Sequence, residues 1–187
     1  MLLGSGGYTG RSIALNRKGV PVAELTNLES KLGEVMGLAM AAQAATDKVS
    51  GLAENEGDPE LVSKLRRMHR EAAETEARCM SIVETLEGKK TAIKEEAAST
   101  KRKAAEMMKI YLDADSEALD GVEFLMMAEA GEVGHWRVLS RMGDRANDQR
   151  VKELCDWAVA IQERHFQEVK VASEQLATAE DPSAVAV

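Results

Sequence analysis

Long segments of this chain place apolar residues at alternating intervals of three and four, which puts them on one side of an α-helix. One such stripe consists of Leu25, Leu28, Leu32, Val35, Met36 and Ala39, and another of Leu61, Leu65, Met68, Ala72, Cys79, Val83 and Leu86. The composition supports helices, because it is rich in Ala, Glu, Leu, Met and Lys and contains only three prolines. The sequence therefore predicts an all-α protein.

Stop and start signals divide the chain into five helices. Pro21 suits a first helical turn, and Gly57-Asp58-Pro59 ends one helix and begins the next. Gly143 is expected to end a helix and Asn147 to cap the one that follows. The predicted helices span residues 21–50, 59–88, 90–112, 116–142 and 147–177. Residues 1–20 read as an extended, Gly-rich arm, 21–178 as the helical domain and 179–187 as a flexible tail.

Two long helix pairs closed by short loops and joined by a long charged connection are typical of a four-helix bundle with one helical crossover. A three-helix protein or an extended coiled coil is the structural alternative. The connection carries Lys94, Lys101 and Lys103, but Glu95, Glu96 and Glu106 interleave with them. This pattern predicts a solvated helix face rather than a binding patch.

The net charge and the apolar pattern exclude some classes of protein. A formal charge of −8 argues against nucleic-acid binding, which requires a basic face. No run of about 18 apolar residues is present, so no membrane span is expected. The first residues lack a signal peptide pattern. Cys79 and Cys155 lie on apolar helix faces without metal-type spacing and are expected to be buried, reduced thiols. These features favour a cytoplasmic protein.

Two acidic residues interrupt the apolar stripe of the predicted helix 116–142. The stripe consists of Val122, Leu125, Glu129, Glu132, Trp136 and Leu139. Ionised carboxylates at core positions are costly unless they are paired or bound to a cation. Glu129 and Glu132 are therefore the strongest candidates for a functional site.

The following helix has a similar polar interruption at Gln162 and His165. If the two helices fold back on each other about residue 147, Glu132 comes near Gln162 and Glu129 near His165. In the first helix pair, folding about residue 54 places Glu29 opposite Glu76. Helix ends displace such estimates by several residues.

Carboxylates and an imidazole that project into a bundle core are what a di-iron or di-manganese site requires. The candidate metal ligands are Glu29, Glu76, Glu129, Glu132, Gln162 and His165. The alternative is a core network without metal, in which His165 and Gln162 hydrogen-bond to the two glutamates, or in which a buried carboxyl stays protonated.

The chain resembles the ferritin-like superfamily, and more narrowly the stress-associated YciF-like bacterial family. The resemblance rests on residues 25–32, 71–75, 132–139 and 154–169. It implies a ferritin-like four-helix bundle, often dimeric, with a dinuclear iron or manganese centre. It also implies that Glu29 and Glu132 are ligands from the first and third bundle helices. The chain departs from the family's Glu-x-x-His pattern, because Arg66 precedes His69 and Gln162 precedes His165.

Two classes of function follow from these patterns. The first is a metal-binding protein of the cytoplasm, with oxidase, peroxidase or catalase-like activity if it is an enzyme, and protective against stress. The second is a metal-free bundle that serves as a structural or interaction module. In either case we expect a homodimer or higher homo-oligomer, with the arm at 1–20 or the tail at 179–187 available for docking into a larger assembly.

Overall fold

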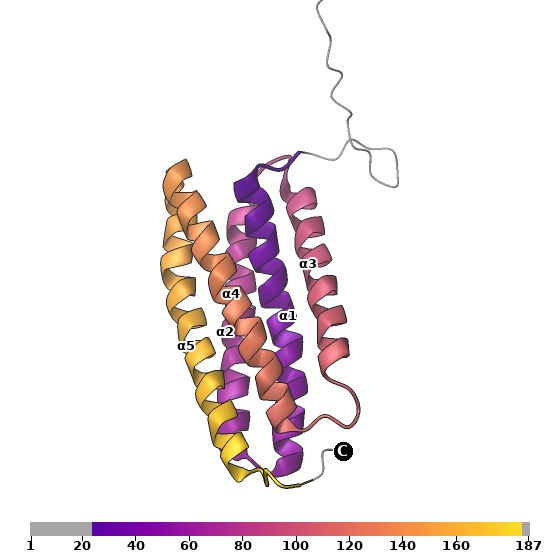
Figure 1. Ribbon diagram of the computed structural model, residues 1–187. Coiled ribbons are helices and arrows are strands. Elements are labelled where there is room, and N and C mark those ends of the chain that lie inside the picture. The colour runs from indigo at the N-terminus through magenta and orange to yellow at the C-terminus, as the bar shows by residue number, and fades with distance from the viewer. Residues whose placement is uncertain (1–23, 185–187) are drawn as a thin grey trace, which may run out of the picture.

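The computed structural model describes residues 24–184, and within that range every regular element is a helix (Figure 1). The helices are α1 (Asn27–Glu56), α2 (Pro59–Val83), α3 (Lys90–Tyr111), α4 (Ala118–Ala146) and α5 (Gln149–Ala179). The all-α class is confirmed. The predicted arm at 1–20 and Pro21 lie outside the described residues, as do the last three residues of the tail.

The helices run alternately down and up the molecule in Figure 1. Helices α1 and α2 form one antiparallel pair, and α4 and α5 form the other. The pairs meet where α1 contacts α4 and where α2 contacts α5. Helix α3 returns the chain from the end of α2 to the beginning of α4 and packs mainly on the outer side of α1. The turns of the two pairs therefore lie at opposite ends of the molecule.

The two turns have the same local design. Gly57 adopts the left-handed conformation at the end of α1, and Asp58 accepts hydrogen bonds from the first backbone N–H groups of α2. Asn147 is also left-handed at the end of α4, and Asp148 caps α5 in the same way. Glycine and asparagine accept this conformation with little strain, and aspartate is a strong N-cap. The prediction that Asp58 caps the second helix is confirmed.

Several predicted helix ends were wrong. Helix α1 continues through Gly51, because a single helical glycine costs only about 1 kcal/mol and the tertiary contacts of α1 outweigh it. Gly143 lies inside α4, where its missing side chain leaves room for Val151. Asn147 ends α4 rather than capping α5. Helix α2 ends at Val83, five residues before its predicted end at Gly88.

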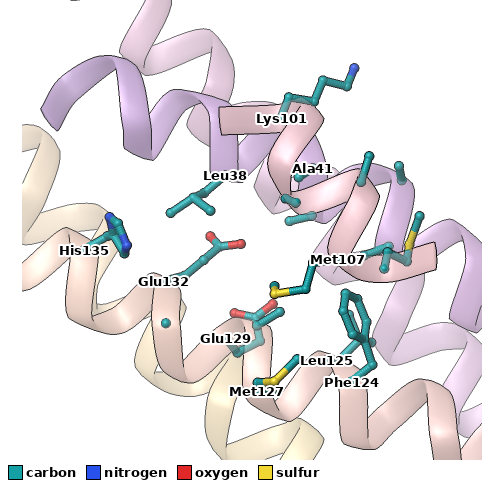
Figure 2. A pocket seen from close by; sticks show the side chains of 18 residues that line it. Leu38, Ala41, Lys101, Met107, Phe124, Leu125, Met127, Glu129, Glu132 and His135 are labelled. Carbon is teal, nitrogen blue, oxygen red and sulfur yellow. The ribbon is translucent and has the colours of Figure 1, made fainter. Parts of the chain in front are cut away.

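A cavity lies between α1, α3 and α4, where α3 and α4 touch only briefly (Figure 2). Its volume is about 190 Å³. Alanines of α1 form one wall, methionines and alanines of α3 another, and α4 contributes the third. Small side chains on α1 therefore leave open space beside the middle of α4.

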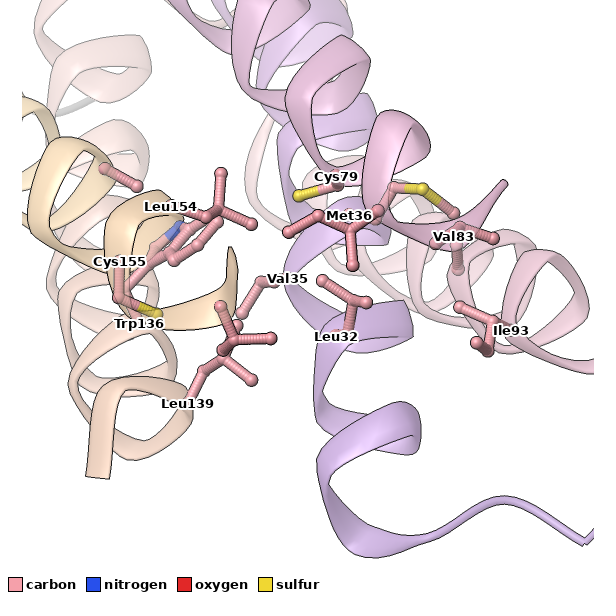
Figure 3. Close-up of a cluster of buried hydrophobic side chains, with 14 residues drawn as sticks. Leu32, Val35, Met36, Cys79, Val83, Ile93, Trp136, Leu139, Leu154 and Cys155 are labelled. Carbon is pink, nitrogen blue, oxygen red and sulfur yellow. The ribbon is translucent and has the colours of Figure 1, made fainter. Parts of the chain in front are cut away.

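The apolar core consists of two clusters near opposite ends of the bundle. In the first, Leu32 and Val35 of α1 pack between Trp136 of α4 and Val83 of α2 (Figure 3). The second surrounds Val49, Leu61, Val122, Leu125 and Val169. Both cysteines are buried and free in the first cluster, as predicted. Burial raises the pKa of the Cys155 thiol to about 12, so this thiol is not poised as a nucleophile.

Among residues 24–184, no helix is both long and apolar enough to span a bilayer.

Candidate acidic site in the bundle core

Glu129 and Glu132 lie one helical turn apart in the middle of α4, and both are almost fully buried. Glu129 is 2% exposed and Glu132 is 4% exposed. Both carboxyl groups line the cavity, and Figure 2 shows that of Glu132 pointing into the open space. The Oε2 atom of each is buried without a hydrogen-bond partner. The prediction that these two residues occupy core positions is confirmed.

His165 on α5 lies between two carboxylates. Its Nε2 is 2.6 Å from Oε2 of Glu71, and its Nδ1 is 3.7 Å from Oε2 of Glu129. The first distance is a short hydrogen bond, whereas the second is too long for one. The predicted proximity of Glu129 and His165 is thus confirmed. Gln162, one turn earlier on α5, is also buried, and its Oε1 has no hydrogen-bond partner within the described residues.

Glu71 of α2 is the site residue that the sequence analysis did not select. It lies on the shoulder of the α2 stripe, where glutamates are normally solvated, and only the packing of α2 on α5 shows its contact with His165. Arg164 holds its other oxygen at 2.6 Å. The sequence signal was the basic residue His165 on an apolar stripe, because a buried imidazole that carries a charge needs an acidic partner.

The charges around His165 stabilise its protonated form. Burial by itself lowers the pKa of His165, but Glu129 and Glu71 outweigh burial and raise it above its ordinary value. Burial likewise raises the pKa of Glu71, while the hydrogen bonds and charges of His165 and Arg164 lower it more, to a value below the ordinary one. The pair is therefore an imidazolium–carboxylate ion pair under mildly acidic conditions.

Glu132 has no such partner. Burial, and next the negative charge of Glu129, raise the pKa of Glu132 well above its ordinary value. A buried carboxyl in this position stays neutral unless a cation approaches it. We call Glu129, Glu132, Gln162 and His165 the acidic layer. Within this layer, Glu132 is the group that most needs an additional positive charge or hydrogen-bond donor.

The other two predicted ligands lie apart from this layer. Glu29 forms a capping box with Thr26 at the beginning of α1 and lies 3.6 Å from Lys89. Glu76 accepts a hydrogen bond of 2.7 Å from Gln43. The predicted pairing of Glu29 with Glu76 was wrong, because α1 runs to Glu56 and the fold-back point is later than residue 54.

The two helix pairs can be compared position by position, since their turn residues Gly57 and Asn147 differ by 90 in number (147 − 57 = 90). The same difference matches each polar residue of the second pair with a residue of the first. Glu129, Glu132, Gln162 and His165 correspond to Ala39, Ala42, Ala72 and Thr75. All four counterparts are buried. The first pair thus offers three methyl groups and a hydroxyl where the second offers carboxyl, amide and imidazole groups.

The carboxylate and imidazole groups of this site are donor types that bind transition metals. Within residues 24–184 no three His, Cys, Asp or Glu side chains are already gathered as a metal cluster. Two tetrahedral ligands about 2.1 Å from one ion are roughly 3.4 Å apart, which is close to the 3.7 Å between Glu129 and His165. Glu71 accepts the hydrogen bond from the far nitrogen of His165, the usual support for a metal-binding imidazole. The spacing of Glu129 and His165 thus resembles that of two ligands of one ion, while no third ligand is gathered beside them within residues 24–184.

His135 and His69 make other contacts. His135 lies 3.2 Å from Glu34 at the edge of the cavity, and His69 lies 3.1 Å from the backbone carbonyl of Gln43. Within the described residues, neither histidine forms a hydrogen bond or ion pair with Glu129, Glu132, Gln162 or His165.

No protein-family model, curated protein or solved structure matches this chain. The chemistry of the acidic layer is therefore the basis for any statement about function.

Proposed function

We propose that this protein is a ferritin-like bundle that binds one divalent transition-metal ion between Glu129, Glu132 and His165. The observation that carries the proposal is the pair of buried, unpartnered carboxyl oxygens on α4, next to an imidazole that Glu71 orients. Mixed oxygen and nitrogen donors suit iron(II) or manganese(II). The ferritin-like assignment is supported by the order of the two antiparallel pairs around a long helical connection.

The proposal is for one ion, whereas the sequence led us to expect two. A second ion would need carboxylates from α1 and α2, and the positions that correspond to Glu132 and His165 hold Ala42 and Thr75. A bound iron or manganese ion would supply redox chemistry toward oxygen or peroxide. The protein's part is to neutralise the ion with two carboxylates and to hold His165 through Glu71 and Arg164.

Metal content tests the proposal. Protein is treated with chelator, dialysed against manganese(II) or, without oxygen, iron(II), and analysed for bound metal. We expect about one ion per chain in the wild type and little in Glu132→Gln or His165→Gln, because each change removes a ligand. Glu76→Gln is the matched control, since Glu76 lies outside the layer and should bind as the wild type does. Equal metal content in wild type and Glu132→Gln would contradict the proposal.

A metal-free structural or interaction module is the second candidate. The observation in its favour is the ion-pair network of His165, Glu71, Arg164, Arg67 and Glu168, which links α2 to α5 without any further group. This candidate predicts that Glu129→Gln combined with Glu132→Gln folds with unchanged or higher stability, and that added metal raises the thermal stability of neither protein.

The homo-oligomer, the cytoplasmic location and the stress-related role stay predictions. Val138 and Val171 are exposed apolar side chains on α4 and α5 that a subunit contact would cover. Sedimentation of the full chain, with and without residues 1–20, tests the oligomer and the docking role of the arm together.

A further inference from the structure

The cavity between α1, α3 and α4 combines apolar walls with an acidic end. Its polar lining is confined to four ionisable side chains and its remaining lining consists of alanine, leucine, methionine, phenylalanine and glycine. Glu129 and Glu132 form the acidic end, next to the bundle core. Lys101 and His135 are the other two ionisable side chains (Figure 2). Such a space accepts a molecule with one polar end and an apolar body.

The acidic end lacks a donor. The Oε2 atoms of Glu129 and Glu132 are buried and have no hydrogen-bond partner, and both residues are more than nine-tenths buried. An apolar occupant would leave these oxygens unsatisfied, at a cost of about 1–3 kcal/mol for each. An anionic occupant would bring no donor and would be repelled by the negative charge of Glu129. A primary ammonium group has three N–H donors and a positive charge, so it can donate a hydrogen bond to both carboxyl groups at once.

The size of the cavity follows from the alanines of α1. Ala41, Ala42 and Ala45 line it, and Ala42 is the residue that corresponds to Glu132 in the other helix pair. An apolar cavity of about 150 Å³ holds one benzene molecule, so 190 Å³ has room for one ring with one or two more heavy atoms. Met107 and Met127 form flexible parts of the wall that adjust to the shape of an apolar body.

We propose that this cavity binds a small primary amine, with the ammonium group between Glu129 and Glu132 and an apolar body of about one ring against the alanines of α1. Figure 2 shows the amine of Lys101 pointing away from the cavity, so this residue adds no positive charge to the acidic end. The site needs no metal ion, so it goes beyond the proposed function. Because the ammonium group and a metal ion would both use Glu132, the two ligands compete.

Calorimetric titration of chelator-treated protein with benzylamine tests the proposal. We expect saturable binding of benzylamine, at least tenfold tighter than that of benzyl alcohol, and no binding of benzoate. Benzyl alcohol has nearly the same shape as benzylamine but no charge, whereas benzoate carries a negative charge in place of the positive one. Equal affinity for benzylamine and benzyl alcohol, or no binding of benzylamine at all, would overturn the proposal.

Two variants locate the site. Ala42→Leu fills the cavity, and Glu132→Gln removes one carboxyl group; each should weaken benzylamine binding at least tenfold. Ala77→Leu, on the exposed face of α2, and Glu76→Gln are the matched controls and should bind as the wild type does. Circular dichroism checks that each variant is folded. If Ala42→Leu does not fold, Glu132→Gln decides alone, and wild-type affinity in that variant contradicts the proposal.

The metal proposal and the amine proposal can be tested separately on the wild-type protein. Metal analysis reports on the ion, and titration of metal-free protein reports on the amine, so either can fail without the other. If both hold, one equivalent of manganese(II) should reduce the apparent affinity for benzylamine at least tenfold.

Discussion

The two helix pairs of this protein have the same turn and different interiors. Each turn places a left-handed Gly57 or Asn147 before an aspartate that caps the next helix. At matched positions in the middle of the bundle, however, α4 and α5 bury Glu132 and His165, whereas α1 and α2 bury Ala42 and Thr75. The shared turns fix how each pair folds back. The interiors can differ, because α4 and α5 supply the polar groups, whereas the small side chains of α1 leave the cavity beside them.

The difference also explains where the unsatisfied atoms lie. Glu129 has His165 nearby, and Glu71 reaches His165 from the shoulder of α2. Glu132 faces the alanine wall of α1 and finds no partner there. The asymmetry between the pairs thus creates both the cavity and the carboxyl group that lines it.

Giving the pair α1/α2 the carboxyl group that α4 carries at the matched position should have the largest effect on stability. Ala42→Glu places a third carboxyl group beside Glu129 and Glu132 and should lower the free energy of unfolding of metal-free protein by about 3 kcal/mol or more. Manganese(II) should restore much of this loss, because a cation balances the added charge. Urea denaturation with and without the metal measures both effects, with Ala42→Gln as the control of equal size. Equal stability of the two variants without metal would contradict this view of the layer.

Removing the imidazole should have the next largest effect, and this effect depends on pH. His165→Gln leaves Glu71 without the ion pair that links α2 to α5, at a cost of about 2 kcal/mol near pH 6. Because the pKa of His165 is raised in the folded protein, its contribution is complete below the unfolded value of about 6.5 and is lost as the pH rises through the folded value. Denaturation of both proteins from pH 5 to 9 should therefore show a difference that shrinks with rising pH. A stability difference that grows with rising pH would contradict this prediction.

Neutralising Glu132 should be mildly stabilising in metal-free protein. Its raised pKa means that the folded state holds a proton that the unfolded state releases, so the stability of the wild type falls as the pH rises above the ordinary value. Glu132→Gln lacks this dependence and should be more stable than the wild type by about 1 kcal/mol at pH 7, with little difference at pH 4. Thermal melts at the two pH values measure it, and a less stable variant at pH 7 would show that the carboxylate is already paired.

The turns should show the smallest effects. Gly57→Ala should destabilise by about 1 kcal/mol, because alanine is strained in the left-handed conformation that Gly57 adopts. Asn147→Gly should stabilise by roughly 0.5 kcal/mol for the same reason. Nothing lies near the missing side chain of Gly57, so a larger loss on adding a methyl group would point to a contact rather than to strain.

The helices and the contact between α4 and α5 were predictable from the sequence, because both depend on short-range patterns. The contact between Glu129 and His165 joins neighbours in one hairpin, so helical periodicity and a single fold-back point near residue 147 were enough to place it. The pairing of Glu29 with Glu76 failed, because it used a glycine, Gly51, as a helix end. A lone glycine costs too little to end a helix that its neighbours hold in place.

By itself, the sequence determined the elements and turns, because helix periodicity, Asp58 and the left-handed residues act over a few positions. It also singled out Glu129, Glu132, Gln162 and His165 as polar residues on apolar stripes. Only the tertiary structure decided that Glu71 supports His165 and that Ala42 faces the cavity with Glu132 at its acidic end. These contacts join helices that are distant in the sequence, and they depend on how α2 meets α5 and how α3 leans away from α4.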